Sequence, residues 1–330
     1  MRFNRLLCGA IAVALTTVVS ARLPAANPII TDAFTADPAP LVVGDTVYLY
    51  CGQDEAPSPK SAEFVMNRWL CYSSKDMKTW KAEGSPLAPK DFTWAKADAW
   101  ASQVIERNGK FYWYAPVEHD KSHPGKAIGV AVSDKPTGPF KDARGSALIT
   151  NDMTPEFKSD HDDIDPTVWI DDDGQAWLYW GNHRCYYAKL KANMIELDGE
   201  IHTVPLDQIP DFREAPWIHK RNGIYYLSYA VGMPEKIAYS TAEKITGPWT
   251  YRGLLAEGAS NSFTIHQGII TFKGVDYFVY HNGSMQQGTK LDSGNGFRRS
   301  VCVDYLYYNA DGSIKRVVQT TEGTDLPPQK

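Results

Sequence analysis

The sequence lacks the short motifs that mark the commonest enzyme classes. There is no CxxC pair, no HExxH, no GxSxG and no glycine-rich phosphate loop in the 330 residues. Their absence argues against the common zinc sites, the serine hydrolases and the nucleotide-binding enzymes. Basic runs are also missing, and the formal net charge is -5. A chain with this balance lacks the basic patch that nucleic-acid binding requires, so we expect no nucleic-acid partner.

Cysteine is scarce, with five residues in the whole chain. Four of them follow the N-terminal segment: Cys51, Cys71, Cys185 and Cys302. Cys51 and Cys71 fall on what should be consecutive strands, so a cross-strand disulfide is one interpretation in an oxidising compartment. Buried free thiols are the interpretation that we favour, because the sequence does not fix which residues of the two strands face each other.

Long apolar runs are confined to the N-terminus. Two arginines precede an apolar run over residues 6–19, and small residues form a cleavage motif at 19–21. This pattern predicts a signal peptide over residues 1–21. The run is short for a membrane span, and Cys8 lies near its start instead of after it, which argues against a lipoprotein anchor. We therefore expect a soluble mature protein that is secreted or periplasmic and has no membrane partner.

The sequence does contain a unit that recurs five times. Each unit has a glycine turn followed by an aromatic-rich strand, and the turn glycines are Gly44, Gly109, Gly174, Gly223 and Gly274. The spacing of roughly 50 to 65 residues is typical of propellers and other repeat arrays. A third strand follows each hairpin, and near-identical turns, KPTGPF and KITGPW, follow two of these strands. Four short antiparallel strands in each of five units predict an all-β, five-bladed β-propeller.

The repeat runs without interruption, so we expect one propeller domain over residues 27–323 and a C-terminal tail at 324–330. A chain of 330 residues is long enough for one large all-β domain. Aromatic residues make up 12% of the chain, with ten Trp and eighteen Tyr. Many of these should pack inside the blades, and the remainder suits stacking against sugar rings. We expect a monomer without an appended carbohydrate-binding module.

The starts of the innermost strands carry charged groups that folding alone does not require. In a propeller the first strand of each blade lines the central channel, so these starts converge. Three of the five place a carboxylate just before a proline or an Ala-Pro pair, at Asp37, Asp165 and Glu214, and the fifth carries His266. Any one of these could be a turn residue. Together, three acids and an imidazole would shift one another's pKa values, which favours a catalytic site.

Carboxylates that face each other across a pocket are the groups that glycoside hydrolysis requires. One protonates the leaving oxygen, and the other activates a water molecule or attacks the sugar. A third carboxylate can orient the acid and keep its pKa high by like-charge repulsion. The sequence therefore indicates a glycosidase.

The same motifs resemble glycoside hydrolase family 43, in its arabinofuranosidase and xylosidase group of five-bladed propellers. The resemblance covers nearly all of residues 27–323. It rests on ADP near the N-terminus, DIDPTVWIDDDG, REAPW before RNGIYYLSYA, TGPW, HQGIITFKG with YHN, and RRSVCVDYLYYNADGSI. It implies that Asp37 is the general base, that Asp165 orients the acid and tunes its pKa, and that Glu214 is the general acid.

The resemblance also implies residues that bind substrate or metal. Trp100 and Arg299 are implied contacts of the sugar. His266 matches the axial histidine, implied to face the substrate and to lie near a calcium ion or a cluster of water molecules. Calcium would be structural, and no organic cofactor is implied. Relatives usually have Glu-Gly-Pro where this chain has Ala215 after the acid, and we expect the extra methyl group to narrow the pocket slightly.

The implied function is that of an exo-acting, inverting enzyme that removes α-L-arabinofuranosyl or β-xylosyl units from plant cell-wall polysaccharides or oligosaccharides. An endo-arabinanase or an exo-β-galactosidase is the alternative on the same fold, because loop lengths do not distinguish a closed pocket from an open groove. A non-catalytic carbohydrate-binding propeller is an alternative of another class. It predicts loss of one of the three carboxylates, and all three are present.

Overall fold

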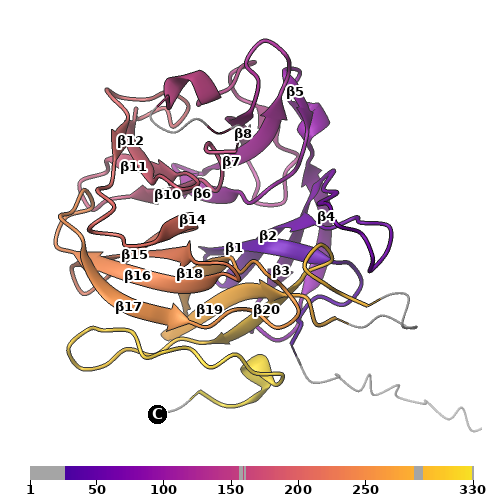
Figure 1. Cartoon of the computed structure of the whole chain (residues 1–330), viewed down its shortest axis with the longest axis vertical. Helices are drawn as coiled ribbons and strands as arrows, with labels where there is room; N and C mark the ends of the chain where they lie inside the picture. Colours follow the sequence, from indigo (N-terminus) through magenta and orange to yellow (C-terminus); the bar gives the residue numbers. More distant parts are fainter. Residues whose placement is uncertain (1–26, 156–158, 160, 286–292, 329–330) are drawn as a thin grey trace, which may run out of the picture.

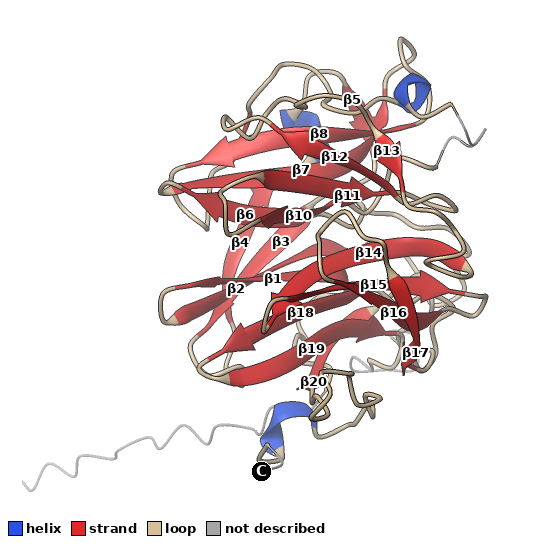
Figure 2. Cartoon of the chain, turned by 90° about the vertical axis from the view of Figure 1, so that its left-hand side faces the viewer, coloured by secondary structure: helices blue, strands red, loops and turns tan. Residues whose placement is uncertain are grey.

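The computed structural model describes residues 27–155, 159, 161–285 and 293–328, and strands dominate it. Five antiparallel sheets follow one another along the chain and surround a common centre (Figure 1). Short 3-10 turns, at Pro89–Asp91, Asn151–Met153 and Gly323–Asp325, are the helical elements of the described residues (Figure 2). No helix within these ranges has the length and hydropathy needed to cross a membrane. The prediction of an all-β, five-bladed propeller is confirmed, and the predicted signal peptide lies outside the described residues.

The blades are numbered in chain order. Blade 1 contains β1 (Thr35–Val43), β2 (Thr46–Gln53), β3 (Trp69–Ser74) and β4 (Lys81–Leu87). Blade 2 contains β5 (Ala95–Ala97), β6 (Gln103–Arg107), β7 (Lys110–His119), β8 (Lys126–Ser133) and β9 (Lys141–Asp142). Blade 3 contains β10 (Thr167–Ile170), β11 (Ala176–Trp180), β12 (Tyr186–Leu190) and β13 (His202–Thr203). Blade 4 contains β14 (Phe212–Arg221), β15 (Ile224–Val231), β16 (Lys236–Ala242) and β17 (Thr250–Ala256). Blade 5 contains β18 (Gln267–Phe272), β19 (Val275–Asn282) and β20 (Ser300–Tyr305).

The recurring glycines form the turns that were predicted. All five have a left-handed backbone, with φ from +59° to +83°. Three of the turns contain two residues that both have positive φ: Asn108-Gly109, Asn222-Gly223 and Lys273-Gly274. This is the type I′ geometry, whose twist matches that of the flanking strands. Each turn brings an inner strand back as the second strand of its blade, so the inner strands surround the centre of the ring (Figure 1).

Two blades differ from the prediction of four strands in every blade, since blade 2 has five described strands and blade 5 has three. In blade 5, a segment from elsewhere in the chain covers the outer edge. The segment before β1 lies beside its outer strand β20 instead of forming a regular strand. The Ile29 N–H donates to the Val301 carbonyl (2.8 Å), and Asn27 Oδ1 accepts the N–H of Val303 (2.8 Å). The edge of β20 is therefore covered by residues from the other end of the described chain, which closes the ring between blades 5 and 1.

The hydrophobic core lies between neighbouring blades. Five clusters of buried side chains each join the facing sides of two adjacent blades. Trp69 and Trp113 pack together in the cluster between blades 1 and 2, with ring centroids 5.8 Å apart. Many of the aromatic residues of the repeat therefore serve packing, and few remain for a binding site.

The strand register rules out the cross-strand disulfide. Cys51 pairs with Leu70, and Cys71 pairs with Tyr50. Because successive side chains of a strand point to opposite faces, the two thiols lie on opposite sides of blade 1. Cys51 packs in the cluster toward blade 5 and Cys71 in the cluster toward blade 2. All four described cysteines are free and buried, as we had favoured.

Candidate active site

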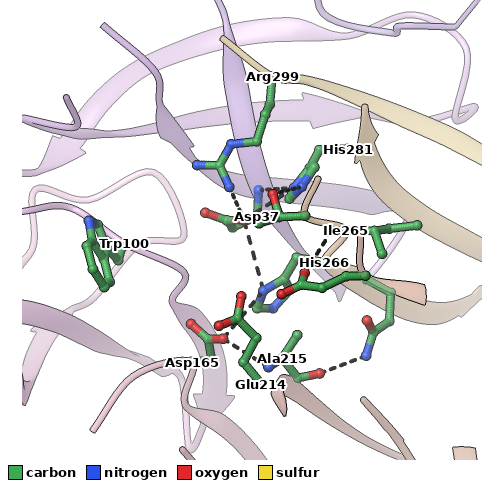
Figure 3. A network of polar contacts seen from close by, with 12 residues as sticks. Asp37, Trp100, Asp165, Glu214, Ala215, Ile265, His266, His281 and Arg299 are labelled. Carbon is green, nitrogen blue, oxygen red and sulfur yellow. Dashed lines mark hydrogen bonds and ion pairs between the residues drawn. The ribbon is translucent and has the colours of Figure 1, made fainter. Parts of the chain in front are cut away.

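The starts of the inner strands open into a cavity of about 450 Å³. Every predicted site residue lines this cavity: Asp37, Trp100, Asp165, Glu214, His266 and Arg299. The side chains come from all five blades, because the segments before β6, β10, β18 and β20 and the strands β1 and β14 bring them there. Figure 3 shows His266 between Asp37 on one side and Asp165 and Glu214 on the other, with Trp100 set apart from them.

An unusual backbone conformation aims the carboxylates. Asp37 and Asp165 directly precede a proline and have left-handed φ values of 55° and 57°. In blade 4 the residue before the proline is Ala215, with φ 57°, and Glu214 stands one position earlier. The β1–β2 pairing shifts register around Asp37, and the β14–β15 pairing shifts on both sides of Glu214. Such bulges turn a side chain out of the regular ladder, here toward the cavity.

Asp37 is held as an anion. Its side chain is nearly buried, and Oδ1 lies 3.1 Å from Arg299 Nη1 and 3.2 Å from His281 Nδ1. Burial raises the pKa of Asp37, but the charge of Arg299, followed by the contact with His281, outweighs it, so the pKa lies well below its usual range. Arg299 is itself fixed by Asp54, through Nε to Oδ2 (2.9 Å) and Nη2 to Oδ1 (3.0 Å). Asp37 is therefore ionised at neutral pH, the state that a general base requires.

Asp165 has the opposite electrostatic environment. Burial raises its pKa well above the usual range, and the charges of Glu214 and Asp37 raise it further, against the hydrogen bond that it accepts from Ala215. That bond runs from the Ala215 N–H to Asp165 Oδ2 (2.9 Å). Asp165 thus holds the backbone next to Glu214 and places a carboxyl group with a high pKa beside it.

His266 lies between the acids as a neutral ring. Its Nδ1 is 4.0 Å from Asp37 Oδ1 and 3.9 Å from Asp165 Oδ2. Burial lowers the pKa of His266 to about 4, against the charge of Asp37, which raises it. The imidazole therefore separates the two acids without carrying a charge at neutral pH.

Glu214 is the least buried of the three predicted carboxylates, and it meets the cavity on β14. The amide of Asn182, a residue that follows β11, donates to its Oε2. A fourth acid, Glu235, lies in the same cavity, and its side chain contacts that of Glu214. The acid predicted to protonate the leaving group is thus held by neighbours from blades 3 and 4.

The ring of Trp100 packs against a buried cation. Lys126 Nζ lies 3.7 Å from the centroid of its ring, close enough for a cation–π contact. Lys126 is 2% exposed and pairs with Asp98 and Glu118, the latter at 3.4 Å. A ring fixed in this way suits the predicted sugar contact.

The side chains give little support to the predicted calcium site. Calcium takes about six to eight oxygen ligands. Within the described ranges, no group of three or more His, Cys, Asp and Glu side chains has the geometry to hold a metal ion. The side chains around His266 do not form a calcium cage, so an ion there stays a prediction of the resemblance.

Several residues of the site were not predicted, namely Asp54, Glu235 and the roles of Asn182 and His281. Asp54 directly follows β2, the strand that pairs with β1, so the hairpin pattern of the sequence indicates that Asp54 lies near Asp37. Glu235 had none, because it lies in an acidic-basic turn that looks solvated. The expected effect of the Ala215 methyl group is not observed. Ala215 is 1% exposed and packs in the core between blades 4 and 5, so it does not narrow the cavity.

Comparison with known proteins identifies the family. A family model, glycosyl hydrolases family 43, matches residues 25–314. The chain is 31% identical to a xylosidase/arabinosidase of Bacteroides ovatus, over 88% of this chain and 96% of that protein. It is similar to the structure of an α-L-arabinofuranosidase of Clostridium thermocellum ATCC 27405, with 35% identity, a TM-score of 0.71 and coverage of 89% of this chain and 97% of that chain.

A second solved structure is that of a β-xylosidase/α-arabinofuranosidase from a compost microbial metagenome, in complex with xylotriose and in a calcium-free form. The TM-score is 0.77 at 28% identity, over 89% of this chain and 98% of that chain. The family match spans most of the chain, and the propeller and its cavity agree with it. This chain is therefore a member of glycosyl hydrolases family 43.

Proposed function

We propose that this protein is an exo-acting, inverting glycoside hydrolase. It releases α-L-arabinofuranosyl or β-xylosyl units from plant cell-wall polysaccharides or oligosaccharides. Three carboxylates from three blades meet in one cavity, and this observation carries the proposal. Asp37 is the general base, Glu214 the general acid, and Asp165 the residue that orients the acid.

The electrostatics support these roles. Asp37, kept ionised by Arg299 and His281, removes a proton from a water molecule. The oxygen of that water attacks the anomeric carbon while the bond to the leaving oxygen breaks, and Glu214 gives its proton to that oxygen. Asp165 fixes the backbone of the neighbouring Ala215 and so the aim of Glu214. One water is consumed, and the two acids return to their starting states after a proton exchange with solvent.

Inversion is supported by the way the two reacting acids enter the cavity. Asp37 comes from blade 1 and Glu214 from blade 4, and Figure 3 draws them on either side of His266. Opposed carboxylates that are roughly 6.5 to 9.5 Å apart leave room for the attacking water. A retaining enzyme needs the two groups about 5 Å apart.

The substrate assignment rests on the cavity and on the relatives. A cavity of about 450 Å³ suits a terminal sugar better than a long chain. Relatives that share about 30% of the sequence act, by their names, on xylosyl and arabinosyl units. We further propose that residues 27–323 form the catalytic domain, exported by the segment at 1–21 as a secreted or periplasmic monomer.

A panel of aryl glycosides tests the function. We expect release of arabinose from the α-L-arabinofuranoside, with xylose from the β-xyloside second. Asp37→Asn should abolish both activities, whereas Asp45→Asn, in an exposed turn of the same blade, should leave them unchanged. Cleavage of galactosides alone, or of internal arabinan bonds alone, would favour the alternatives on this fold. No hydrolysis of any glycoside would contradict the proposal.

A further inference from the structure

We propose that Glu235 is a positioning residue of this site, which keeps its own proton and donates a hydrogen bond to Glu214. The inference rests on the proposed function, because it assigns a partner to the general acid. Glu235 has no role in the family resemblance drawn from the sequence. It lies in the turn between β15 and β16, where an acid next to a lysine is expected to face solvent.

The structure buries Glu235 instead. The residue is 1% exposed and lines the cavity together with Glu214. Its backbone N–H donates to the Phe263 carbonyl (2.9 Å), and its Oε2 accepts the N–H of Ile265 (3.0 Å). Both partners belong to the loop that leads to β18. Glu235 is therefore clamped between blade 4 and the start of blade 5, with its carboxyl group directed to the cavity.

Among the described residues, Glu214 and Arg213 on β14 are the charged groups that act on Glu235. Arg213 Nε lies 3.3 Å from Glu235 Oε1, but the two groups are not aligned for a hydrogen bond. With both side chains ionised, neither atom has a hydrogen-bond partner among the described residues. The neighbouring Lys236 points away and pairs with Glu257 (2.8 Å). Glu235 is thus not neutralised by a well-formed ion pair.

The contact between Glu235 and Glu214 requires a proton. Two carboxylates offer only acceptor oxygens, so a hydrogen bond between their side chains needs one of them to be protonated. Burial raises the pKa of Glu235 to about 10, and the charge of Glu214 and their hydrogen bond raise it as well, against the Ile265 N–H and Arg213. Glu235 is 1% exposed, whereas Glu214 is only partly buried, so the proton stays on the more deeply buried Glu235, which acts as the donor.

A donor at this position helps the acid in two ways. Together with Asn182, it restricts the side chain of Glu214, the most exposed carboxylate of the three. It also stabilises the carboxylate that Glu214 becomes after it has given its proton to the leaving oxygen, because the donor is already in place. Glu235 itself neither touches the reacting atoms nor transfers a proton to the sugar.

Two variants distinguish a Glu235 that is a protonated donor from a Glu235 that is the ionised partner of Arg213. Glu235→Gln keeps a donor of the same shape, whereas Glu235→Leu removes it. We expect the Gln variant to retain kcat within about threefold and to keep the shape of the pH profile. The Leu variant should lose about 10-fold or more in kcat on aryl arabinofuranosides with poor leaving groups. The Leu variant should lose little kcat on activated substrates, and the alkaline limb of its pH profile should be displaced from that of the wild type. Glu257→Gln, an exposed acid with the same charge change, is the matched control.

Equal losses in the Gln and Leu variants, independent of the leaving group, would overturn the inference in favour of an ion pair with Arg213. A second measurement needs neither turnover nor the Leu variant. The infrared difference spectrum between the wild type and Glu235→Gln at pH 7 should show a protonated carboxyl band in the wild type, and a carboxylate band instead would overturn the inference. If the wild type hydrolyses no glycoside, the proposed function fails, while this spectrum still decides the state of Glu235.

Discussion

Asp37 and Asp165 show how environment separates two identical side chains. Both stand before a proline with nearly the same left-handed backbone, and both are buried. Arg299 and His281 lower the pKa of Asp37 against its burial, whereas burial and the charges of Glu214 and Asp37 raise that of Asp165. Pairs of acids whose pKa values are pushed apart are typical of acid–base catalysis. The same motif can thus supply a base in one blade and a supporting acid in another.

Replacement of Glu214 by Ala tests its role as the acid. The variant should lose activity strongly on substrates with poor leaving groups, by about 10²- to 10⁴-fold in kcat. Activated aryl glycosides should be affected far less, because their leaving groups depart without a proton. The measurement is kcat against the pKa of the leaving group for the wild type and the variant. A uniform loss across the series would indicate a structural role instead.

The pH dependence of stability tests the burial of a neutral Glu235. Its pKa is about 10 in the folded protein, against 4.5 for the free side chain, because burial and then the charge of Glu214 raise it. The unfolded chain releases this proton above its own pKa, and the folded chain keeps it. Glu235 therefore lowers stability progressively as the pH rises from about 4.5 toward 10.

The Gln variant lacks this dependence because it does not titrate. The difference in the free energy of unfolding between Glu235→Gln and the wild type should grow in favour of the variant between pH 5 and pH 9. The slope should stay below about 1.4 kcal/mol per pH unit. Urea unfolding at several pH values measures it. A difference that stays constant with pH would mean that Glu235 is already ionised in the folded protein.

At the scale of the element, the bulges at the starts of the inner strands direct the side chains of the site into the cavity. They interrupt the ladders of β1 and β14 at the residues whose side chains must leave the sheet. Left-handed backbone is costly for residues with a Cβ atom, by about 1 to 2 kcal/mol. Asp tolerates it comparatively well, but Ala215 has no polar side chain to compensate. The Ala215 N–H donates a hydrogen bond to Asp165, and the Ala215 carbonyl accepts one from Gln267 Nε2 (2.9 Å). These two bonds hold the Ala215 backbone in place.

A β-branched residue at position 215 should be poorly tolerated. Ala215→Val should lower the free energy of unfolding by more than Ala256→Val, a substitution in the same core cluster at a residue without positive φ. Both changes overpack the core, so the difference, on the order of 1 kcal/mol, reports the cost that β-branching adds to a left-handed backbone beyond the cost that Ala215 already bears. Chemical denaturation measures both variants. Equal losses would show that the left-handed conformation at Ala215 carries no extra cost.

The elements were more predictable than the contacts of the site. The glycine turns and the carboxylates before prolines are local patterns, so five blades and Asp37, Asp165 and Glu214 followed from short stretches of sequence. Glu235 and Asp54 act through partners far along the chain, such as Ile265 and Arg299. The incomplete blade 5 was missed for the same reason, because its edge is covered by residues 27–29 and not by a local hairpin.

At the scale of the whole molecule, Asn27 ties the two ends of the ring together. Its side chain accepts the Val303 N–H and donates to the carbonyls of Val303 (3.1 Å) and Thr320 (2.9 Å). The cavity depends on the same closure, since Asp37 of blade 1 meets Arg299 of blade 5. A ring whose first and last blades separate would lose the cation that keeps Asp37 ionised.

Asn27→Ala should therefore lower the free energy of unfolding by about 1 to 3 kcal/mol, the cost of buried backbone groups that lose their partners. At temperatures where the variant is folded, kcat should stay close to that of the wild type, because no cavity residue has changed. Asn309→Ala, in an exposed turn, is the control. A variant as stable as the wild type would show that the Asn27 contacts do not contribute to closure.

The central claim is that Asp37 and Glu214 act from opposite sides of the cavity as base and acid of an inverting reaction. Proton NMR of the sugar released in the first minutes of hydrolysis tests it most directly, before the anomers equilibrate. The account predicts that the first product has the anomeric configuration opposite to that of the substrate. A first product with the configuration of the substrate would contradict the roles of Asp37 and Glu214, even if both residues prove essential.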